Sequence, residues 1–195
     1  MNNVWFPPPQ NVVKINVHGV IDEIPWANGN TNGVGIIVRD HNSRFLWGIM
    51  APMHGLEGFQ SQIWAIHLAM KITFQRQIPH VHIQSDNMIA FDMFVDQDEE
   101  ELEEEGLTVV VQQINILFTE YNKPRQNLAS QKSCKVYSVF TTRNRAPSYM
   151  AEFAFRNCSG LVEVPTPFGD LYEILDLDHG LGPNLPAFDI QIWTG

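Results

Sequence analysis

Apolar residues alternate with polar ones, or follow one another without a break, in three segments near the start of the chain. These segments are residues 12–17, 34–39 and 45–50, and their patterning is typical of β-strands. A polar turn of hairpin length, Asp40-His41-Asn42-Ser43, separates the second segment from the third. The pattern therefore predicts three antiparallel strands in a meander.

Helical periodicity begins after the meander. Apolar residues recur at helical spacing between Phe59 and Arg76, and Pro79 follows the end of this helix. Beyond it the pattern predicts strands at 80–84 and 136–141 and helices at 87–95, 109–121 and 147–156. The order β-β-β-α-β-α-α-β-α predicts an α/β fold, in which helices flank a mixed five-stranded sheet.

Two segments depart from this pattern. Residues 160–195 are rich in Pro and Gly, and we interpret them as an irregular C-terminal extension of a domain that covers residues 1–159. One apolar segment of the extension, Leu171 to Leu177, could pack back on the domain. Residues 96–105 are an acidic insert with eight of the 22 acids of the chain, and we interpret this insert as a solvated, disordered loop.

Composition narrows the class of protein. A hydrophobic content of 44% supplies a core, and the two cysteines lie in no motif that would suggest a disulfide framework or a zinc site. No apolar run approaches the length of a membrane span, so we expect a soluble protein of a reducing compartment, cytoplasmic or nuclear. The net charge is −10, but without the acidic insert it is 12 − 14 = −2. The charge therefore does not exclude a nucleic-acid partner.

Short motifs then point to a family. Trp5, the prolines at 7–9 and the segment Lys14-Ile-Asn-Val-His-Gly19 resemble the opening of plant ribonuclease H-like domains of the reverse-transcriptase-associated type. Further matches follow in the same order as far as Asn157, at residues 33–40, 62–65, 84–87 and 144–151. The resemblance implies a ribonuclease H-like fold and a plant source.

The resemblance also implies a catalytic site and shows where this chain departs from it. Enzymes of this family hold two Mg²⁺ or Mn²⁺ ions with four carboxylates, because closely spaced cations repel unless anionic oxygens surround them. The corresponding positions in this chain are His18, Gln62, Asp86 and Ser148, of which only Asp86 is acidic. The formal charge of the site falls from −4 to −1, which predicts a nuclease-deficient or weakly active protein.

Other interpretations of the same residues stay open. Asp86 could be a remaining metal ligand or only a helix cap, and His18 could be a ligand, a general base or a tolerated replacement. Asp22 and Glu23 follow the first strand and could supply part of the missing charge. One alternative function is therefore an active metal-dependent ribonuclease rebuilt around Asp86 with His18 and Asp22. Another is an adaptor that binds a protein partner.

The basic residues gather in one segment. From Tyr121 to Ala151 the chain has no acid and six of its twelve Lys and Arg residues. These six, with Asn144 of the family's closing motif, form the predicted nucleic-acid-binding set: Lys123, Arg125, Lys132, Lys135, Arg143, Arg145 and Asn144. They predict binding to an RNA-containing duplex, either an RNA·DNA hybrid or double-stranded RNA, although such a segment could also be a solvated edge. A further hypothesis is that the acidic insert folds over this segment and competes with nucleic acid.

Overall fold

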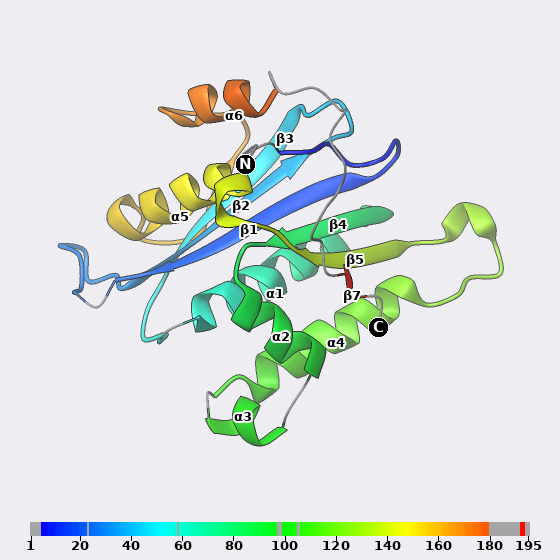
Figure 1. The fold of residues 1–195 in the computed structure, drawn as a ribbon, viewed down its shortest axis with the longest axis horizontal. Helices are drawn as coiled ribbons and strands as arrows, with labels where there is room; N and C mark the ends of the chain where they lie inside the picture. Colours follow the sequence, from blue (N-terminus) through cyan, green and yellow to red (C-terminus); the bar gives the residue numbers. More distant parts are fainter. Residues whose placement is uncertain are drawn as a thin grey trace.

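A seven-stranded sheet forms the centre of the protein (Figure 1). The structure, a computed structural model, describes residues 5–22, 24–57, 59–96, 99–104, 106–179 and 192–193. The strands lie in the order β6-β3-β2-β1-β4-β5-β7. Their bounds are β1 Val13–Ile21, β2 Asn32–Arg39, β3 Phe45–Met53, β4 His80–Ser85, β5 Ser133–Ser138, β6 Val162–Val164 and β7 Ile192–Trp193.

The sheet is mixed, as the sequence predicts. The pairs β1·β2 and β2·β3 are antiparallel, which confirms the meander, and β4 lies parallel to both β1 and β5. The five predicted strands form the middle of the sheet. The residues interpreted as an irregular extension add two short edge strands, because β6 pairs with β3 and β7 pairs with β5.

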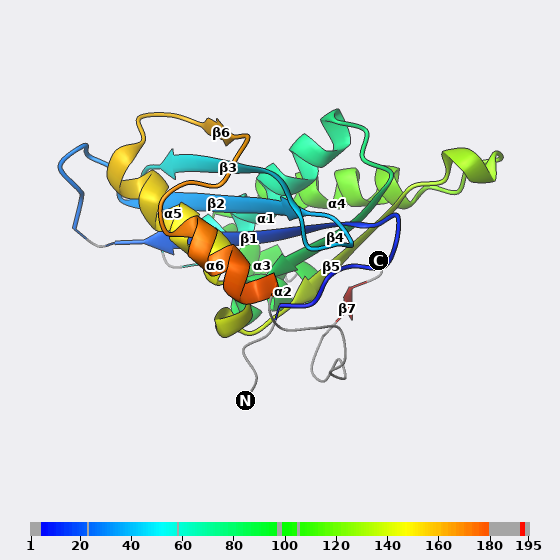
Figure 2. The same cartoon turned by 90° about the horizontal axis from the view of Figure 1, so that it is seen from above.

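Helices cover both faces of the sheet. Figure 2 shows α5 and α6 on one side of the strands and α1 and α4 on the other. The helices are α1 Gln60–Gln75, α2 Met88–Asp96, α3 Glu99–Glu104, α4 Thr108–Asn122, α5 Arg145–Asn157 and α6 Leu171–His179. All eight residues of β2 are buried, since the strand lies in the middle of the sheet with helices over both of its faces. No helix in the described part of the chain is long and apolar enough to cross a bilayer.

Close contact between α5 and the sheet depends on two glycines of β2. A Cβ atom at Gly33 would collide with the backbone of Ala151, and one at Gly35 would collide with the backbone of Pro147. The missing side chains therefore let α5 lie directly on the strand. This contact places the first turn of α5, which includes Ser148, near the centre of the sheet.

The extension docks on the domain. The predicted apolar segment forms α6, and its Leu171 and Leu175 are buried in a cluster with Ile37 and Met50. The interpretation of the extension as irregular is therefore wrong for this part, because its apolar residues are covered only once α5 and β2 are in place. Residues 180–191 and 194–195 of the extension lie outside the described residues.

The acidic insert is partly helical. Its residues 99–104 form α3, and Leu102 of this helix is buried in the main core, so the interpretation as a solvated loop is wrong there. Residues 97, 98 and 105 lie outside the described part. In Figure 1, α3 lies beside the start of α4, while the basic segment begins at the end of that helix. A helix of 15 residues is about 22 Å long, so the structure does not place α3 over the basic segment.

Candidate functional site

The site forms where the carboxyl ends of β1 and β4 lie side by side. Val17 is paired with Ser85 in the parallel ladder, so the next residues along each strand, His18 and Asp86, are neighbours. The Nδ1 atom of His18 lies 2.8 Å from Oδ1 of Asp86, and the Asp86 side chain is almost completely buried. Two of the four predicted positions are therefore in direct contact.

Gln62 of α1 is the third member of this cluster. A Cβ atom at Gly19 would collide with the backbone of Ser61 and Gln62, so glycine at this position lets the start of α1 lie against β1. The amide Nε2 of Gln62 donates to the carbonyl oxygen of Gly19 at 2.8 Å and lies 3.3 Å from Nδ1 of His18. Three of the predicted positions, His18, Gln62 and Asp86, therefore lie in contact.

These contacts fix the tautomer of His18. The shorter contact, to Asp86, requires a proton on Nδ1, because a carboxylate can only accept. Nδ1 then has no lone pair for the Gln62 amide, which bonds to Gly19 instead. Two buried oxygens of this cluster, Oδ2 of Asp86 and Oε1 of Gln62, have no hydrogen-bond partner among the described residues.

Asp86 does not cap the following helix. The backbone N–H of Ala90 donates to the side-chain oxygen of Asn87 at 2.8 Å, which makes Asn87 the cap of α2. The backbone N–H of Asn87 lies 3.4 Å from the hydroxyl of Ser85. The capping alternative for Asp86 is therefore wrong, and its carboxylate points to His18.

Ser148, the fourth position, makes no such contact. Its hydroxyl donates to the carbonyl oxygen of Asn144 at 2.8 Å, one turn earlier in the chain. A hydroxyl that donates to a backbone carbonyl of its own helix adds no negative charge to the site. The structure therefore joins three of the four predicted positions by direct contacts and leaves Ser148 bonded within α5.

A buried polar network lies next to the site. Asn16 accepts from the indole N–H of Trp5 at 2.8 Å and from Arg39 at 3.0 Å, and it donates to Gln84 at 3.0 Å and to Asn144 at 3.1 Å. The resemblance used Trp5 and Asn16 only as residues of the family's opening motif and assigned them no contact. An asparagine between Ile15 and Val17, in the middle of a strand, was the signal that could have revealed a network, since buried amides need partners.

Asn144 belongs to this network and not to the surface. It is completely buried, and its amide also donates to the carbonyl oxygen of Val17 at 2.7 Å. Its assignment to the nucleic-acid-binding set is corrected accordingly, because a side chain with no exposed surface cannot contact a ligand in this conformation. Its physical role is to join the start of α5 to β1.

The cluster does not fit a pair of divalent cations. Asp86 is its one carboxylate, one oxygen of which is held by His18, and Gln62 offers a neutral amide. Asp22 lies four residues beyond His18, about 13 Å along an extended chain, and its carboxylate accepts from the backbone of Ile24. Glu23 lies outside the described residues. Among the described residues, no group of three or more His, Cys, Asp or Glu side chains could hold a metal ion.

The predicted basic residues occupy two regions. Arg145 is the first residue of α5, and Arg143 lies two residues before it, on the other side of Asn144. Lys123, Arg125 and Lys132 lie in the connection between α4 and β5, and Lys135 is exposed on β5 itself. Lys123 pairs with Glu120, and the ammonium group of Lys132 donates to Gln77. The structure therefore separates the basic segment into a group beside the site and a group beyond the end of α4.

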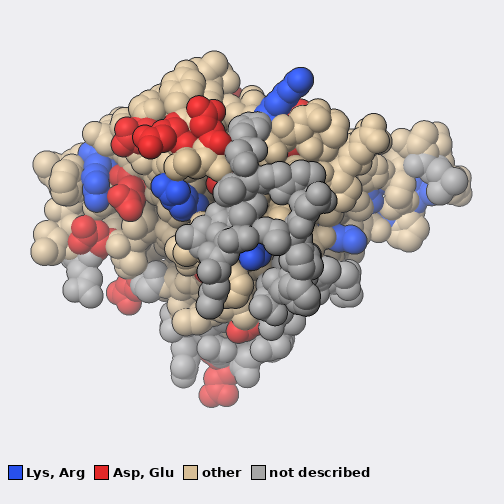
Figure 3. Space-filling view, turned by 45° about the horizontal axis from the view of Figure 1, so that its top comes forward, with Lys and Arg blue, Asp and Glu red and all other residues tan. Residues whose placement is uncertain are grey.

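Acidic side chains gather elsewhere. Figure 3 shows red atoms over the part of the molecule where Figure 1 places α6. The exposed acids on and just before this helix are Asp170, Glu173 and Asp176. A polyanion approaching the protein would be repelled from this surface, which leaves the basic regions near α5 and β5 as the favoured approach.

Comparisons with known proteins agree with this architecture. Residues 26–158 match the family described as reverse transcriptase-like. Ribonuclease H1 from Halobacterium salinarum superposes with a TM-score of 0.56 at 12% identity, covering 73% of this chain and 96% of that chain. LC9-RNase H1 superposes with a TM-score of 0.59 at 12% identity, covering 94% of this chain and 93% of that chain. LC11-RNase H1 in complex with an RNA/DNA hybrid superposes with a TM-score of 0.55 at 13% identity, covering 73% of this chain and 96% of that chain.

These likenesses establish the fold, since the identities are too low to carry activity from one protein to another. No curated protein matches the sequence of this chain. The family match covers more than half of the chain and contains three of the four positions discussed above, Gln62, Asp86 and Ser148. The chain therefore belongs to the reverse transcriptase-like family, and its fold is that of ribonuclease H.

Proposed function

We propose that this chain is a nuclease-deficient member of the ribonuclease H family that binds RNA-containing duplexes in the cytoplasm or nucleus. The observation that carries the proposal is the contact between His18 and Asp86. It uses the remaining carboxylate of the site to hold a histidine of the same chain.

Loss of cleavage follows from the charge and from the donor atoms. Two divalent cations need several hard anionic oxygens, whereas this cluster supplies one carboxylate, one amide and one imidazole. When His18 is protonated, its contact with Asp86 is an ion pair, and the positive ring then repels a cation. Ser148 cannot compensate, because its hydroxyl is neutral and bonded to Asn144.

Retention of binding is supported by the basic residues and by the fold. Lys and Arg side chains bind a phosphate backbone without a catalytic metal, since the interaction depends on charge and on released counterions. Arg143 and Arg145 lie beside the site, and Lys135 is exposed on the next strand of the sheet. A solved protein of the same fold, LC11-RNase H1, is bound to an RNA/DNA hybrid, which makes such a duplex the first ligand to test.

A cleavage assay tests the proposed loss of activity. Wild-type protein is incubated with RNA·DNA hybrid and with double-stranded RNA, first with Mg²⁺ and then with Mn²⁺, and we expect intact substrates. The matched comparison is the triple variant His18→Asp, Gln62→Glu, Ser148→Asp, which restores four carboxylates and is expected to gain metal-dependent cleavage. Cleavage by wild-type protein that is abolished in Asp86→Asn would overturn the proposal and favour the rebuilt active site.

A salt titration tests the proposed binding. The logarithm of the association constant should fall linearly with the logarithm of salt concentration, with a slope close to one unit per phosphate contact. Arg145→Gln should reduce that slope by about one unit, while Lys71→Gln on α1 serves as a control of equal charge change away from the predicted set. Binding that is absent at low salt would refute the proposal and leave the adaptor function.

A further inference from the structure

An exposed aromatic ring lies at the edge of the site just described. Residues 139–144 connect β5 to α5 and are fixed at both ends. The backbone N–H of Val139 donates to the carbonyl oxygen of Ser85 at 2.8 Å, and Asn144 donates to Val17 at 2.7 Å. The connection therefore spans the two strand ends that hold Asp86 and His18. Within it, Phe140 is 52% exposed.

The guanidinium group of Arg143 lies close to this ring and to a second one. The centre of its guanidinium group is 5.6 Å from the ring of Phe140 and 5.5 Å from the ring of Phe6. Such contacts between a cation and an aromatic face contribute about 0.5–1 kcal/mol at exposed sites. The two rings and the guanidinium group thus form a small cluster, which we call the rim cluster: Phe6, Phe140 and Arg143.

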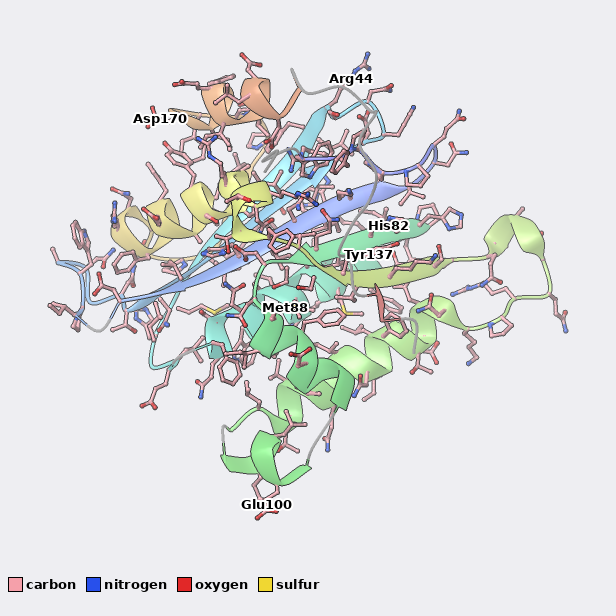
Figure 4. The ribbon with its side chains drawn as sticks, in the orientation of Figure 1. Arg44, His82, Met88, Glu100, Tyr137 and Asp170 are labelled. Carbon is pink, nitrogen blue, oxygen red and sulfur yellow. The ribbon has the colours of Figure 1, made fainter. Side chains whose placement is uncertain are left out.

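The rim cluster has an exposed apolar neighbour, and its arginine has no ion-pair partner among the described residues. Met88, at the start of α2, is 45% exposed, and its sulfur accepts from the hydroxyl of Ser138, two residues before Phe140. Figure 4 labels Met88 below the strand ends and Tyr137 on β5, three residues before Phe140. Neither Arg143 nor Arg145 has an ion-pair partner in the described part of the chain.

We propose that the rim cluster is a binding site for one unpaired nucleobase of RNA, next to the duplex that the protein binds. This inference rests on the proposed binding function and adds a preference for the structure of the nucleic acid. A base would stack on the exposed face of Phe140, while Arg143 and Arg145 neutralise the adjacent phosphates.

The geometry favours an unpaired base over a paired one. Both faces of a base inside a helix are already covered by its neighbours, so an aromatic ring can stack only on a base at a strand end or in a single-stranded extension. Stacking on aromatic side chains contributes about 1–3 kcal/mol per base, and about 1.4 kcal/mol corresponds to a tenfold change in dissociation constant. One stacked base should therefore tighten binding by about tenfold.

Fluorescence anisotropy with three hybrids tests the proposal. The first RNA·DNA hybrid is blunt, the second has a short single-stranded RNA overhang, and the third has the same overhang without bases. Because the abasic overhang keeps its phosphates, it separates stacking from added charge. We expect the overhang with bases to bind about tenfold more tightly than the other two hybrids.

Three variants locate the effect. Phe140→Ala should bring the ratio of overhang affinity to blunt-hybrid affinity down to about one, whereas Phe140→Trp should keep this ratio at about ten. Tyr172→Ala removes a similarly exposed ring from α6 and should leave the ratio as in the wild type. Thermal melting checks that Phe140→Ala is folded. If its melting temperature is low, the comparison of Phe140→Trp with wild-type protein and the comparison of the two overhangs decide instead.

The outcomes distinguish this inference from the proposed function. Equal affinity for the abasic overhang and the overhang with bases would overturn the stacking site, as would a gain that survives in Phe140→Ala. If wild-type protein binds the blunt hybrid in these cases, the proposed function stands. If it binds only hybrids with a base-containing overhang, the stacking site stands and duplex binding is refuted.

Discussion

The ion pair between Arg39 and Asp178 offers a sharp test of how the C-terminal extension is attached. Arg39 ends β2 with its side chain 1% exposed, and Asp178 of α6 is 13% exposed with an oxygen 2.6 Å from the guanidinium group. The guanidinium group also lies 3.6 Å from the ring centre of Trp5 and donates to Asn16. Burial lowers the pKa of Arg39 to about 10, although the Asp178 carboxylate raises it.

Removal of Asp178 should therefore leave a buried, unpaired cation. Breaking a buried ion pair at one partner costs about 3–5 kcal/mol, so Asp178→Ala should lower the free energy of unfolding by this amount. Asp178→Asn keeps a neutral acceptor and should recover about 1 kcal/mol of that loss. The double variant Arg39→Met, Asp178→Leu should be more stable than Asp178→Ala, since apolar side chains remove the uncompensated charge.

Urea unfolding followed by circular dichroism measures these differences. The matched control is Asp176→Ala, which removes an exposed acid of the same helix and should change the free energy of unfolding by less than about 0.5 kcal/mol. A loss of less than about 1 kcal/mol in Asp178→Ala would refute the reasoning. It would mean that water reaches Arg39 and that α6 does not bury the pair.

Three further predictions follow from packing and burial. Burial, together with the charge of Arg39, lowers the pKa of Lys14 from 10.5 to about 7. Between pH 7 and 10.5 the unfolded chain therefore binds more protons than the folded one, so the free energy of unfolding should rise with pH in this window. Lys14→Met should flatten this rise, as measured by urea unfolding at several pH values. Gly35→Ala should destabilise the protein by about 1–3 kcal/mol in thermal melting, because its Cβ would collide with the backbone of α5, while Gly160→Ala, which meets open space, should not. Deletion of residues 160–195 should increase binding of a hydrophobic dye, because Leu171 and Leu175 no longer cover Ile37; unchanged dye binding would contradict the docking of α6.

Much of the fold could be predicted because its cues are local. The period of the apolar residues and the turn residues between them indicated five strands and most helices, and the motif order indicated the family. Some strand boundaries were wrong by several residues: β1 continues to Ile21 instead of ending at 17, and β5 runs from Ser133 to Ser138 instead of 136 to 141. The shift of β5 has a clear cause. Its first residues, Ser133-Cys134-Lys135, are polar enough to resemble a loop, but pairing with β4 makes them a strand.

The candidate site could be predicted in position but not in contacts. The residue types at these positions, His18, Gln62 and Ser148, can be read from the sequence, and the resemblance predicts that they replace three carboxylates. The contact of His18 with Asp86 depends on the parallel pairing of β1 with β4. The burial of Asn144 depends on α5 lying against β1, and no local pattern encodes it.

The sequence by itself determined the order of the elements and the residue types at the four predicted positions, because periodicity and residue type are properties of short segments. Only the tertiary structure decided how the extension and the site are held together. Arg39 and Asp178 are separated by 139 positions in the chain, and their pairing becomes favourable only after the sheet and α6 exclude water. The strength of such an attraction depends on how little water surrounds the two charges, and the exclusion of water is a property of the whole fold.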